Sequence, residues 1–179
     1  EVPSNSLPAS DCLPLVTRIN AGLQDAEYNA SGQLFVCGEG GKLIRSTDGG
    51  ATWAALNSGV TTQLTKMVFK GSSGYAAGDG VLLKSEDNGD TWSQLFVSPN
   101  TAVAAKTLFF LDANVGFVAG LNGEILKTTN GGVSWVSSGK QFPSAPTSLY
   151  FWNENDGIAC TSFGSVHKTS NGGQSWTVV

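Results

Sequence analysis

The chain has 179 residues, of which 40% are hydrophobic and 13% are charged, and its formal net charge is −4. It contains no run of lysine or arginine, so the electrostatic surface that binds nucleic acid or an acidic membrane is missing. No apolar stretch approaches the roughly 18 residues that a membrane span requires, and membrane insertion is therefore not expected. The 23 glycines instead favour many short strands joined by tight turns.

Residues 1–22 do not share the repeat that fills the remainder of the sequence, and we expect them to form an N-terminal arm. Within this arm, the apolar stretch Leu15–Ile19 is predicted to add one edge strand. The first residue is Glu1, which is consistent with a chosen boundary or with removal of an export signal.

Residues 23–179 contain four repeats of one pattern: Ser or Thr, any residue, Asp or Asn, any residue, Gly, any residue, Ser or Thr, and Trp. The tryptophans recur about every 40 residues, which is the period of a four-stranded propeller blade. We therefore expect one propeller domain with blades at approximately 23–60, 61–100, 101–142 and 143–179. The defining positions of the four patterns are Ser46, Asp48, Gly50, Thr52, Trp53, Ser85, Asp87, Gly89, Thr91, Trp92, Thr128, Asn130, Gly132, Ser134, Trp135, Thr169, Asn171, Gly173, Ser175 and Trp176.

The second repeat shows how one blade is built. Met67–Phe69 is predicted as the inner strand, Tyr75–Ala77 as the second, Leu82–Ser85 as the third and Thr91–Phe96 as the outer strand. The predicted fold class is therefore all-β, a β-propeller of four four-stranded blades. The corresponding inner-strand pairs of the other repeats are Ala26 and Tyr28, Leu108 and Phe110, and Leu149 and Phe151.

Four blades lie at the lower limit of propellers, which have about four to eight. The ring is therefore predicted either to close alone or to be completed by oligomerisation. The fourth blade ends directly after its tryptophan, at Thr177–Val179, and residues 13–19 are a candidate to complete its outer strand. Otherwise the exposed blade edges would favour pairing with a second chain.

The four patterns resemble the Asp-box, also called the bacterial neuraminidase repeat, and the resemblance covers residues 23–179. The third pattern in its fuller form, Gly120–Trp135, is similar to blades of the photosystem II assembly and stability factor family and its bacterial relatives. This resemblance implies an extracytoplasmic propeller, periplasmic or secreted, without catalytic residues and without a cofactor. It implies a scaffold for protein interaction or complex assembly, with a protein partner or self-association.

The repeated pattern also has a physical explanation as a turn between the third and fourth strands. An Asp or Asn side chain accepts backbone N–H groups, glycine supplies positive φ, and the Ser or Thr hydroxyl holds the next strand. Asp48, Asp87, Asn130 and Asn171 are therefore predicted to be structural and not catalytic. Because asparagine replaces aspartate in two repeats, no metal site is expected at these turns.

The residue inventory argues against an enzyme. The chain has two arginines, Arg18 and Arg45, whereas sialidases of the Asp-box type hold the substrate carboxylate with three, so sialidase activity is excluded. Catalysis by the carboxylates Glu39 and Asp79 is not expected, because acidic residues at hairpin tips are usually solvated. The single histidine, His167, is expected to be partly buried and hydrogen-bonded.

Two sets of residues are candidates for binding. The connections between second and third strands share one face of the predicted propeller, and they carry Glu39, Asp79, Asn122 and Glu124. A basic residue recurs once in each repeat, as Arg45, Lys84, Lys127 and Lys168. The basic series is interpreted as solvated strand positions, with contact to an acidic partner as the alternative.

The three cysteines give no metal pattern. Cys37 and Cys160 occupy equivalent repeat positions and are expected to be free, buried thiols, while a disulfide between Cys12 and Cys37 stays open. Two other functions also stay open. One is carbohydrate binding, with Phe142 or Trp152 stacking on sugar rings. The other is a fragment of a larger glycoside hydrolase propeller.

Overall fold

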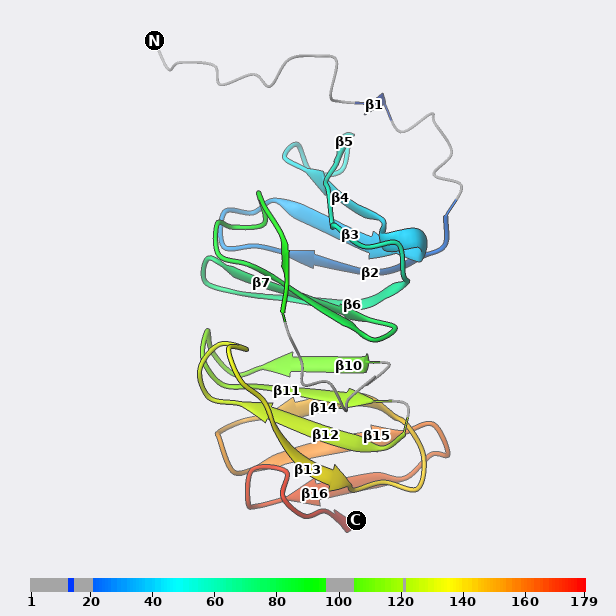
Figure 1. Cartoon of the computed structure of the whole chain (residues 1–179), viewed down its shortest axis with the longest axis vertical. Helices are drawn as coiled ribbons and strands as arrows, with labels where there is room; N and C mark the ends of the chain where they lie inside the picture. Colours follow the sequence, from blue (N-terminus) through cyan, green and yellow to red (C-terminus); the bar gives the residue numbers. More distant parts are fainter. Residues whose placement is uncertain (1–12, 15–20, 96–104, 121) are drawn as a thin grey trace.

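The computed structural model describes residues 13–14, 21–95, 105–120 and 122–179. It is built from four antiparallel sheets that follow one another along the chain, as Figure 1 shows. Helical structure within these residues is confined to one 3₁₀ turn at Glu39–Gly41. The prediction of an all-β fold made of four-stranded blades is confirmed.

Each blade runs from an inner strand to an outer strand in chain order. The first blade consists of β2 (Leu23–Tyr28), β3 (Leu34–Gly38), β4 (Leu43–Ser46) and β5 (Thr52–Ala55). The second consists of β6 (Leu64–Lys70), β7 (Ser73–Gly78), β8 (Val81–Ser85) and β9 (Ser93–Gln94). The third consists of β10 (Ala105–Phe110), β11 (Gly116–Gly120), β12 (Glu124–Thr128) and β13 (Val136–Lys140). The fourth consists of β14 (Pro146–Phe151), β15 (Gly157–Thr161), β16 (Val166–Thr169) and β17 (Thr177–Val178).

The N-terminal strand joins the first blade and not the fourth. β1 (Leu13–Pro14) pairs antiparallel with β5, so the first sheet has five strands. The prediction that residues 13–19 complete the fourth blade is therefore wrong in its strand pairing, because that blade has its own outer strand in β17. Pro14 fits an outermost strand, since it has no backbone N–H to donate to a further neighbour. Residues 15–20 of the predicted arm strand lie outside the described residues.

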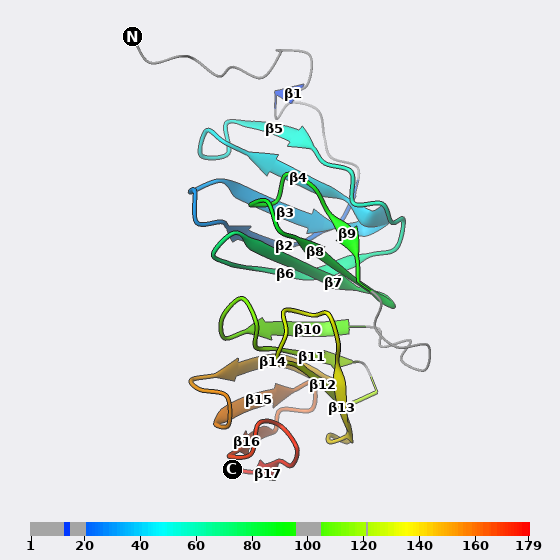
Figure 2. The ribbon, with the colours of Figure 1, turned by 60° about the vertical axis from the view of Figure 1, so that its left-hand side comes forward.

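The four blades form an open arc. The inner strands β2, β6, β10 and β14 lie beside one another in the middle of the molecule, and neighbouring pairs are in contact. From this row the first blade extends toward one end of the molecule and the fourth blade toward the opposite end, as both views show (Figures 1 and 2). Among the described residues, the main contacts between blades join each blade to the one that follows it in the chain.

The hydrophobic core lies between blades and has three parts. Phe35 and Leu43 of the first blade pack on Met67 of the second. The second and third blades meet where Tyr75 stacks on Phe110, with ring centroids 3.6 Å apart. The third and fourth blades are held in the same way by Phe117 and Phe151, also 3.6 Å apart. The tryptophans Trp92, Trp135 and Trp176 cover these clusters from the repeated turns.

Candidate functional site

The four repeated turns (residues 46–53, 85–92, 128–135 and 169–176) are closed by the same hydrogen bonds. In the first, the Ser46 hydroxyl accepts the Gly50 N–H at 2.8 Å, and Asp48 Oδ1 accepts the Thr52 N–H at 2.9 Å. The Trp53 indole N–H donates to the Gly50 carbonyl at 3.0 Å, which places the ring over the turn. Their side chains therefore serve the turn itself, and the absence of a catalytic role stays a prediction.

Asparagine makes the same turn as aspartate. Asn130 Oδ1 accepts the Ser134 N–H at 2.9 Å, and the Asn130 amide also donates to the Ser134 hydroxyl at 2.9 Å. In the aspartate turns, hydrogen bonds from the Thr side chain and backbone stabilise the carboxylate. They lower the pKa of Asp48 and of Asp87 to about 2.

The four residues of the predicted binding face lie on loops of three blades, with Asn122 and Glu124 bonded to each other on one loop. Glu39 Oε2 accepts the Gly22 N–H at 3.0 Å, and Asn122 Oδ1 accepts the Glu124 N–H at 3.0 Å. Ser137 donates to Glu124, and Asp79 is exposed at the β7–β8 turn. The antiparallel topology puts these connections at the end of the sheets opposite the repeated turns. Their role in binding stays a prediction.

Three residues of the basic series, Arg45, Lys84 and Lys127, lie between blades. Arg45 of the first blade pairs with Asp90 of the second. The Lys84 ammonium lies 5.9 Å from the Tyr75 ring and 2.7 Å from Glu86. Lys127 of the third blade donates to the Glu154 carbonyl of the fourth at 3.1 Å.

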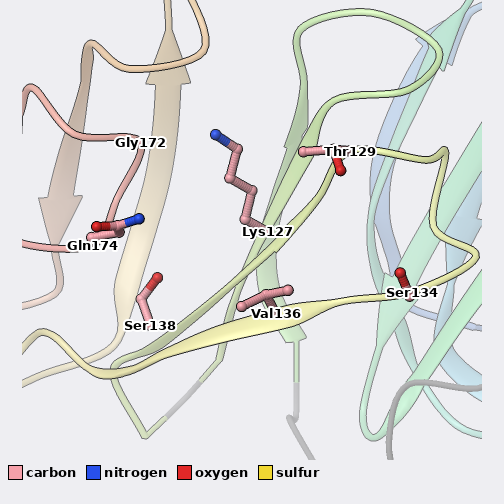
Figure 3. A pocket seen from close by; sticks show the side chains of 7 residues that line it. All are labelled: Lys127, Thr129, Ser134, Val136, Ser138, Gly172 and Gln174. Atoms are coloured by element: carbon pink, nitrogen blue, oxygen red, sulfur yellow. The ribbon is translucent and has the colours of Figure 1, made fainter.

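Lys127 also borders a cavity of about 230 Å³ between the third and fourth blades. Figure 3 shows its side chain reaching from β12 into the space beside the turn that contains Gly172. Lys168, in the fourth blade, is exposed. Contact of this series with a partner stays a prediction, but Arg45 and Lys127 already bind the next blade.

His167 is hydrogen-bonded, with its Nε2 2.9 Å from the Ser165 hydroxyl, and it is more deeply buried than expected. Cys37 and Cys160 are free thiols. Burial raises the pKa of the Cys37 thiol to about 12, so this cysteine stays protonated. Cys160 is only half-buried, contrary to the prediction, because no further blade packs on it. Cys12 lies outside the described residues.

The expectation that Phe142 stacks on a sugar ring is wrong. Phe142 is 1% exposed and packs edge-on against His167, with ring centroids 4.9 Å apart. It belongs to the core between the third and fourth blades. Trp152 is 48% exposed, so it alone of this pair could contact a ligand.

A groove along the four inner strands is the candidate site that the sequence did not reveal. A cavity of about 260 Å³ is lined by residues of every blade, among them Glu27 of β2, Lys66 and Lys70 of β6, Phe109 of β10 and Ser148 of β14. These side chains occupy the strand positions that alternate with the core residues Met67, Leu108 and Leu149. The sequence does contain a signal for this groove, because charged residues stand at alternate positions in 23–28 and 64–70.

The groove combines opposite charges with aromatic rings. Asp25 accepts the Met67 N–H at 2.9 Å and pairs with Lys66 at 3.1 Å, which binds the first blade to the second. Burial and the neighbouring Asp25 raise the pKa of Glu27 above its ordinary value. Lys70 lies 5.7 Å from the centroid of the Phe109 ring. The site therefore presents a carboxylate, an ammonium and an aromatic face to a ligand.

The aromatic side continues onto the fourth blade. Phe109 and Tyr150 lie with ring centroids 5.3 Å apart, and Tyr150 is 55% exposed.

No group of three or more potential metal ligands occurs among the described residues. Within those residues there is also no helix with the length and apolar character needed to cross a bilayer.

Neither a protein-family model nor a curated protein matches this sequence. Solved structures with the same architecture do match. YCF48 from Cyanidioschyzon merolae is 22% identical, with a TM-score of 0.73 over 93% of this chain and 58% of that chain. A structure of YCF48 bound to D1 peptide is 19% identical, with a TM-score of 0.75 over 93% of this chain and 57% of that chain.

An ancestral GH74 enzyme is also similar, with 17% identity and a TM-score of 0.68 over 88% of this chain and 25% of that chain. The chain thus spans a little over half the length of the two YCF48 structures and a quarter of the enzyme. At these identities the likeness establishes the β-propeller fold. It does not carry over an activity or a partner.

Proposed function

We propose that this chain is a non-enzymatic scaffold for protein interaction or complex assembly, and that a partner segment binds along the inner-strand groove. The observation that carries the proposal is the groove itself, where Glu27, Lys70 and the Phe109 ring line one cavity. Ordered charges of both signs beside an aromatic face suit a polypeptide, which offers charged side chains and apolar groups together. The structure of YCF48 bound to D1 peptide is in keeping with such a partner.

The arrangement of acidic and basic groups supports a role without catalysis. Asp25 binds Lys66 and the Met67 N–H, so its carboxyl group is already occupied within the interface between the first two blades. Glu39 and Asp79 lie on loops of different blades. His167 is enclosed between Ser165 and Phe142. The Ser165 hydroxyl lies 2.9 Å from His167 Nε2, but His167 is only 5% exposed and packs against Phe142, so this pair is not open to a substrate.

The loop face with Glu39, Asp79, Asn122 and Glu124 is proposed as a second, wider contact surface for the same protein partner. Its residues are spread over three blades, which suits a folded partner more than a small ligand. The resemblance in the sequence pattern leads us to propose an extracytoplasmic location as well. Detection of the protein in a periplasmic or secreted fraction of the source cells would support that location, and retention in the cytosol would contradict it.

The groove can be tested with a display library of short random peptides. We expect selected peptides to bind the wild-type chain, and Lys70→Glu to weaken that binding by about tenfold or more, because it reverses the charge beside the aromatic face. Lys106→Glu is the matched control, since Lys106 is an exposed lysine of β10. Equal binding by both variants would contradict peptide recognition in the groove.

Carbohydrate binding is the second candidate, and one observation favours it. Tyr150 and Trp152 are both exposed at the end of β14, where flat rings are accessible for stacking on sugars. A glycan array separates the two functions, because a lectin would retain glycans and lose them on Trp152→Ala. Hydrolysis of a polysaccharide panel that disappears on Glu27→Gln, Glu39→Gln or Asp79→Asn would instead establish a glycosidase.

A further inference from the structure

Every blade has two faces, and in the middle of the arc both are covered. We call the face turned toward the following blade the far face and the one turned toward the preceding blade the near face. Phe35, Tyr75 and Phe117 occupy equivalent far-face positions, each opposite the basic residue of its blade, and each is 0% exposed. The far face of one blade and the near face of the next therefore form one repeated interface.

The far face of the fourth blade has residues of similar character in the same register, but no blade among the described residues covers it. Ile158 lies opposite Lys168, as Phe117 lies opposite Lys127. Val166 lies opposite Cys160, in the register of Ile125 and Ala119 of the third blade. Val166 is 41% exposed, whereas Ile125 is fully buried.

The near face of the first blade is uncovered along its inner strand. Leu23 and Tyr28 occupy the positions of Leu64 and Phe69 in the second blade, as their pairing with the second strands shows. Tyr28 is 60% exposed and Leu23 is 47% exposed, while Leu64 is buried against the first blade. Val36 and Ile44 of the same blade are buried, so the uncovered apolar strip follows β2.

The basic series indicates which surface the uncovered far face would bind. Arg45 binds Asp90 of the next blade, and Lys127 binds a backbone carbonyl in the first hairpin of the next blade. Tyr75 makes the equivalent contact for the second blade, donating to the Ala113 carbonyl at 3.0 Å. Lys168 stands at the same position and is exposed. It is placed to bind the first hairpin of a further blade.

We propose that a second copy of this chain supplies that blade. The far face of the fourth blade in each copy packs on the near face of the first blade in the other copy, and Lys168 reaches the partner's hairpin between β2 and β3. Both halves of the repeated interface are present on one chain, so the contact needs no different protein. Two copies give eight blades, which stays within the propeller range of about four to eight, whereas three copies would exceed it. A closed two-fold ring follows.

The association can be measured by light scattering of the purified 179-residue chain over a concentration series. We expect twice the mass of one chain. Tyr28→Glu on the near face and Val166→Glu on the far face should each weaken association by about tenfold or more, because each buries an unpaired charge in the ring interfaces. Val133→Glu is the matched control, since Val133 is 73% exposed in a repeated turn. A chain that stays monomeric would overturn the proposal.

Mixing the two variants tests which faces meet. A Tyr28→Glu chain keeps an intact far face and a Val166→Glu chain keeps an intact near face, so the mixture should regain one of the two interfaces and form a heterodimer. Association through like faces would instead leave one of the variants fully dimeric, which would overturn the proposed ring. Near-wild-type circular dichroism of each variant confirms that a loss of mass does not come from unfolding.

Cross-linking gives an independent measurement. Cys37 and Met67 lie in one interface cluster, and the repeat places Cys160 and Ala26 of two copies in the same relation. Because packed sheets lie about 10 Å apart, a short bifunctional maleimide should join Cys160 to the cysteine of Ala26→Cys in the partner copy. The product should vanish when Cys160→Ser is added. Its persistence there, or its absence at dimer concentrations, would contradict the arrangement. Neither measurement involves the groove, so failure of the ring leaves the peptide-binding test intact.

Discussion

The inner and terminal faces of the arc carry similar residues in different surroundings. Phe117 is fully buried against Phe151, whereas Ile158, at the equivalent position of the last blade, is half-buried. The single hydroxyl proton of Tyr75 is shared between the Ala113 and Gly131 carbonyls across a blade interface, whereas Tyr28 is 60% exposed. Position within the repeat therefore favours an apolar residue, and only a neighbouring blade converts that residue into a stabilising contact, as in other repeat proteins.

The largest effect is expected from truncating the inner contact. Phe117→Ala should lower the free energy of unfolding by about 3–5 kcal/mol, because it removes the ring that stacks on Phe151 and leaves a cavity. Ile158→Ala, the matched end position, should cost no more than about 1 kcal/mol at dilutions where the chain is monomeric. Urea denaturation followed by tryptophan fluorescence measures both. Equal losses would show that the end face is as well packed as the inner one.

A medium effect on the free energy of unfolding is expected from removal of the Tyr75 hydroxyl. Tyr75→Phe keeps the stacking on Phe110 but removes the hydroxyl whose proton is shared between the Ala113 and Gly131 carbonyls, so it should cost about 1–2 kcal/mol. Tyr28→Phe makes the same chemical change on the exposed near face and should change stability by less than about 0.5 kcal/mol. The comparison uses the same denaturation experiment. A Tyr75→Phe chain as stable as wild type would mean that the interblade bonds contribute nothing.

The smallest effect is expected from the repeated turns, which contain aspartate in the first two blades and asparagine in the last two. The pKa values of Asp48 and Asp87 are lowered to about 2 from 3.8, so their bonds stabilise the fold above pH 3.8 and are lost as pH falls toward 2. The double variant Asp48→Asn, Asp87→Asn copies the turns of Asn130 and Asn171. It should show a shallower fall in the urea midpoint between pH 4 and pH 2.

Some acid dependence should persist in that variant. Hydrogen bonds from the Val115 and Asn114 backbone also lower the pKa of Asp112, which the two substitutions leave in place. An unchanged pH profile would show that the turn carboxylates do not contribute to acid stability. A profile that becomes entirely flat would assign the whole acid dependence to these two residues.

The strand pattern was predictable because it depends on short-range features. Trp53, Trp92, Trp135 and Trp176 mark the turns, and the apolar segments between them gave the inner strands at Leu108–Phe110 and Leu149–Phe151. The pairing of β1 was not predictable in the same way. Two residues joining a sheet edge leave no periodic signal, and either open edge of the propeller accepts them.

The candidate site was less predictable than the fold. Hairpin tips can be recognised in a sequence, and this recognition gave the loop positions of Glu39, Asp79, Asn122 and Glu124. The groove residues Glu27, Lys70 and Phe109 come from three different inner strands, and nothing local shows that they line one cavity. Phe142 was expected to be accessible because it lies in a connection between blades. It is buried because the third and fourth blades close over it.

The sequence by itself determined the repeat, the four tight turns and the alternation of buried and polar strand positions. All of these follow from interactions within about 40 residues of chain, where hydrogen bonds and side-chain periodicity act locally. The tertiary structure decided that Arg45 and Lys127 bind the next blade, that four inner strands share one groove, and that apolar residues such as Tyr28 and Val166 stay exposed on the first and fourth blades. Those outcomes depend on how whole blades stack, and stacking is decided by contacts between segments far apart in the chain.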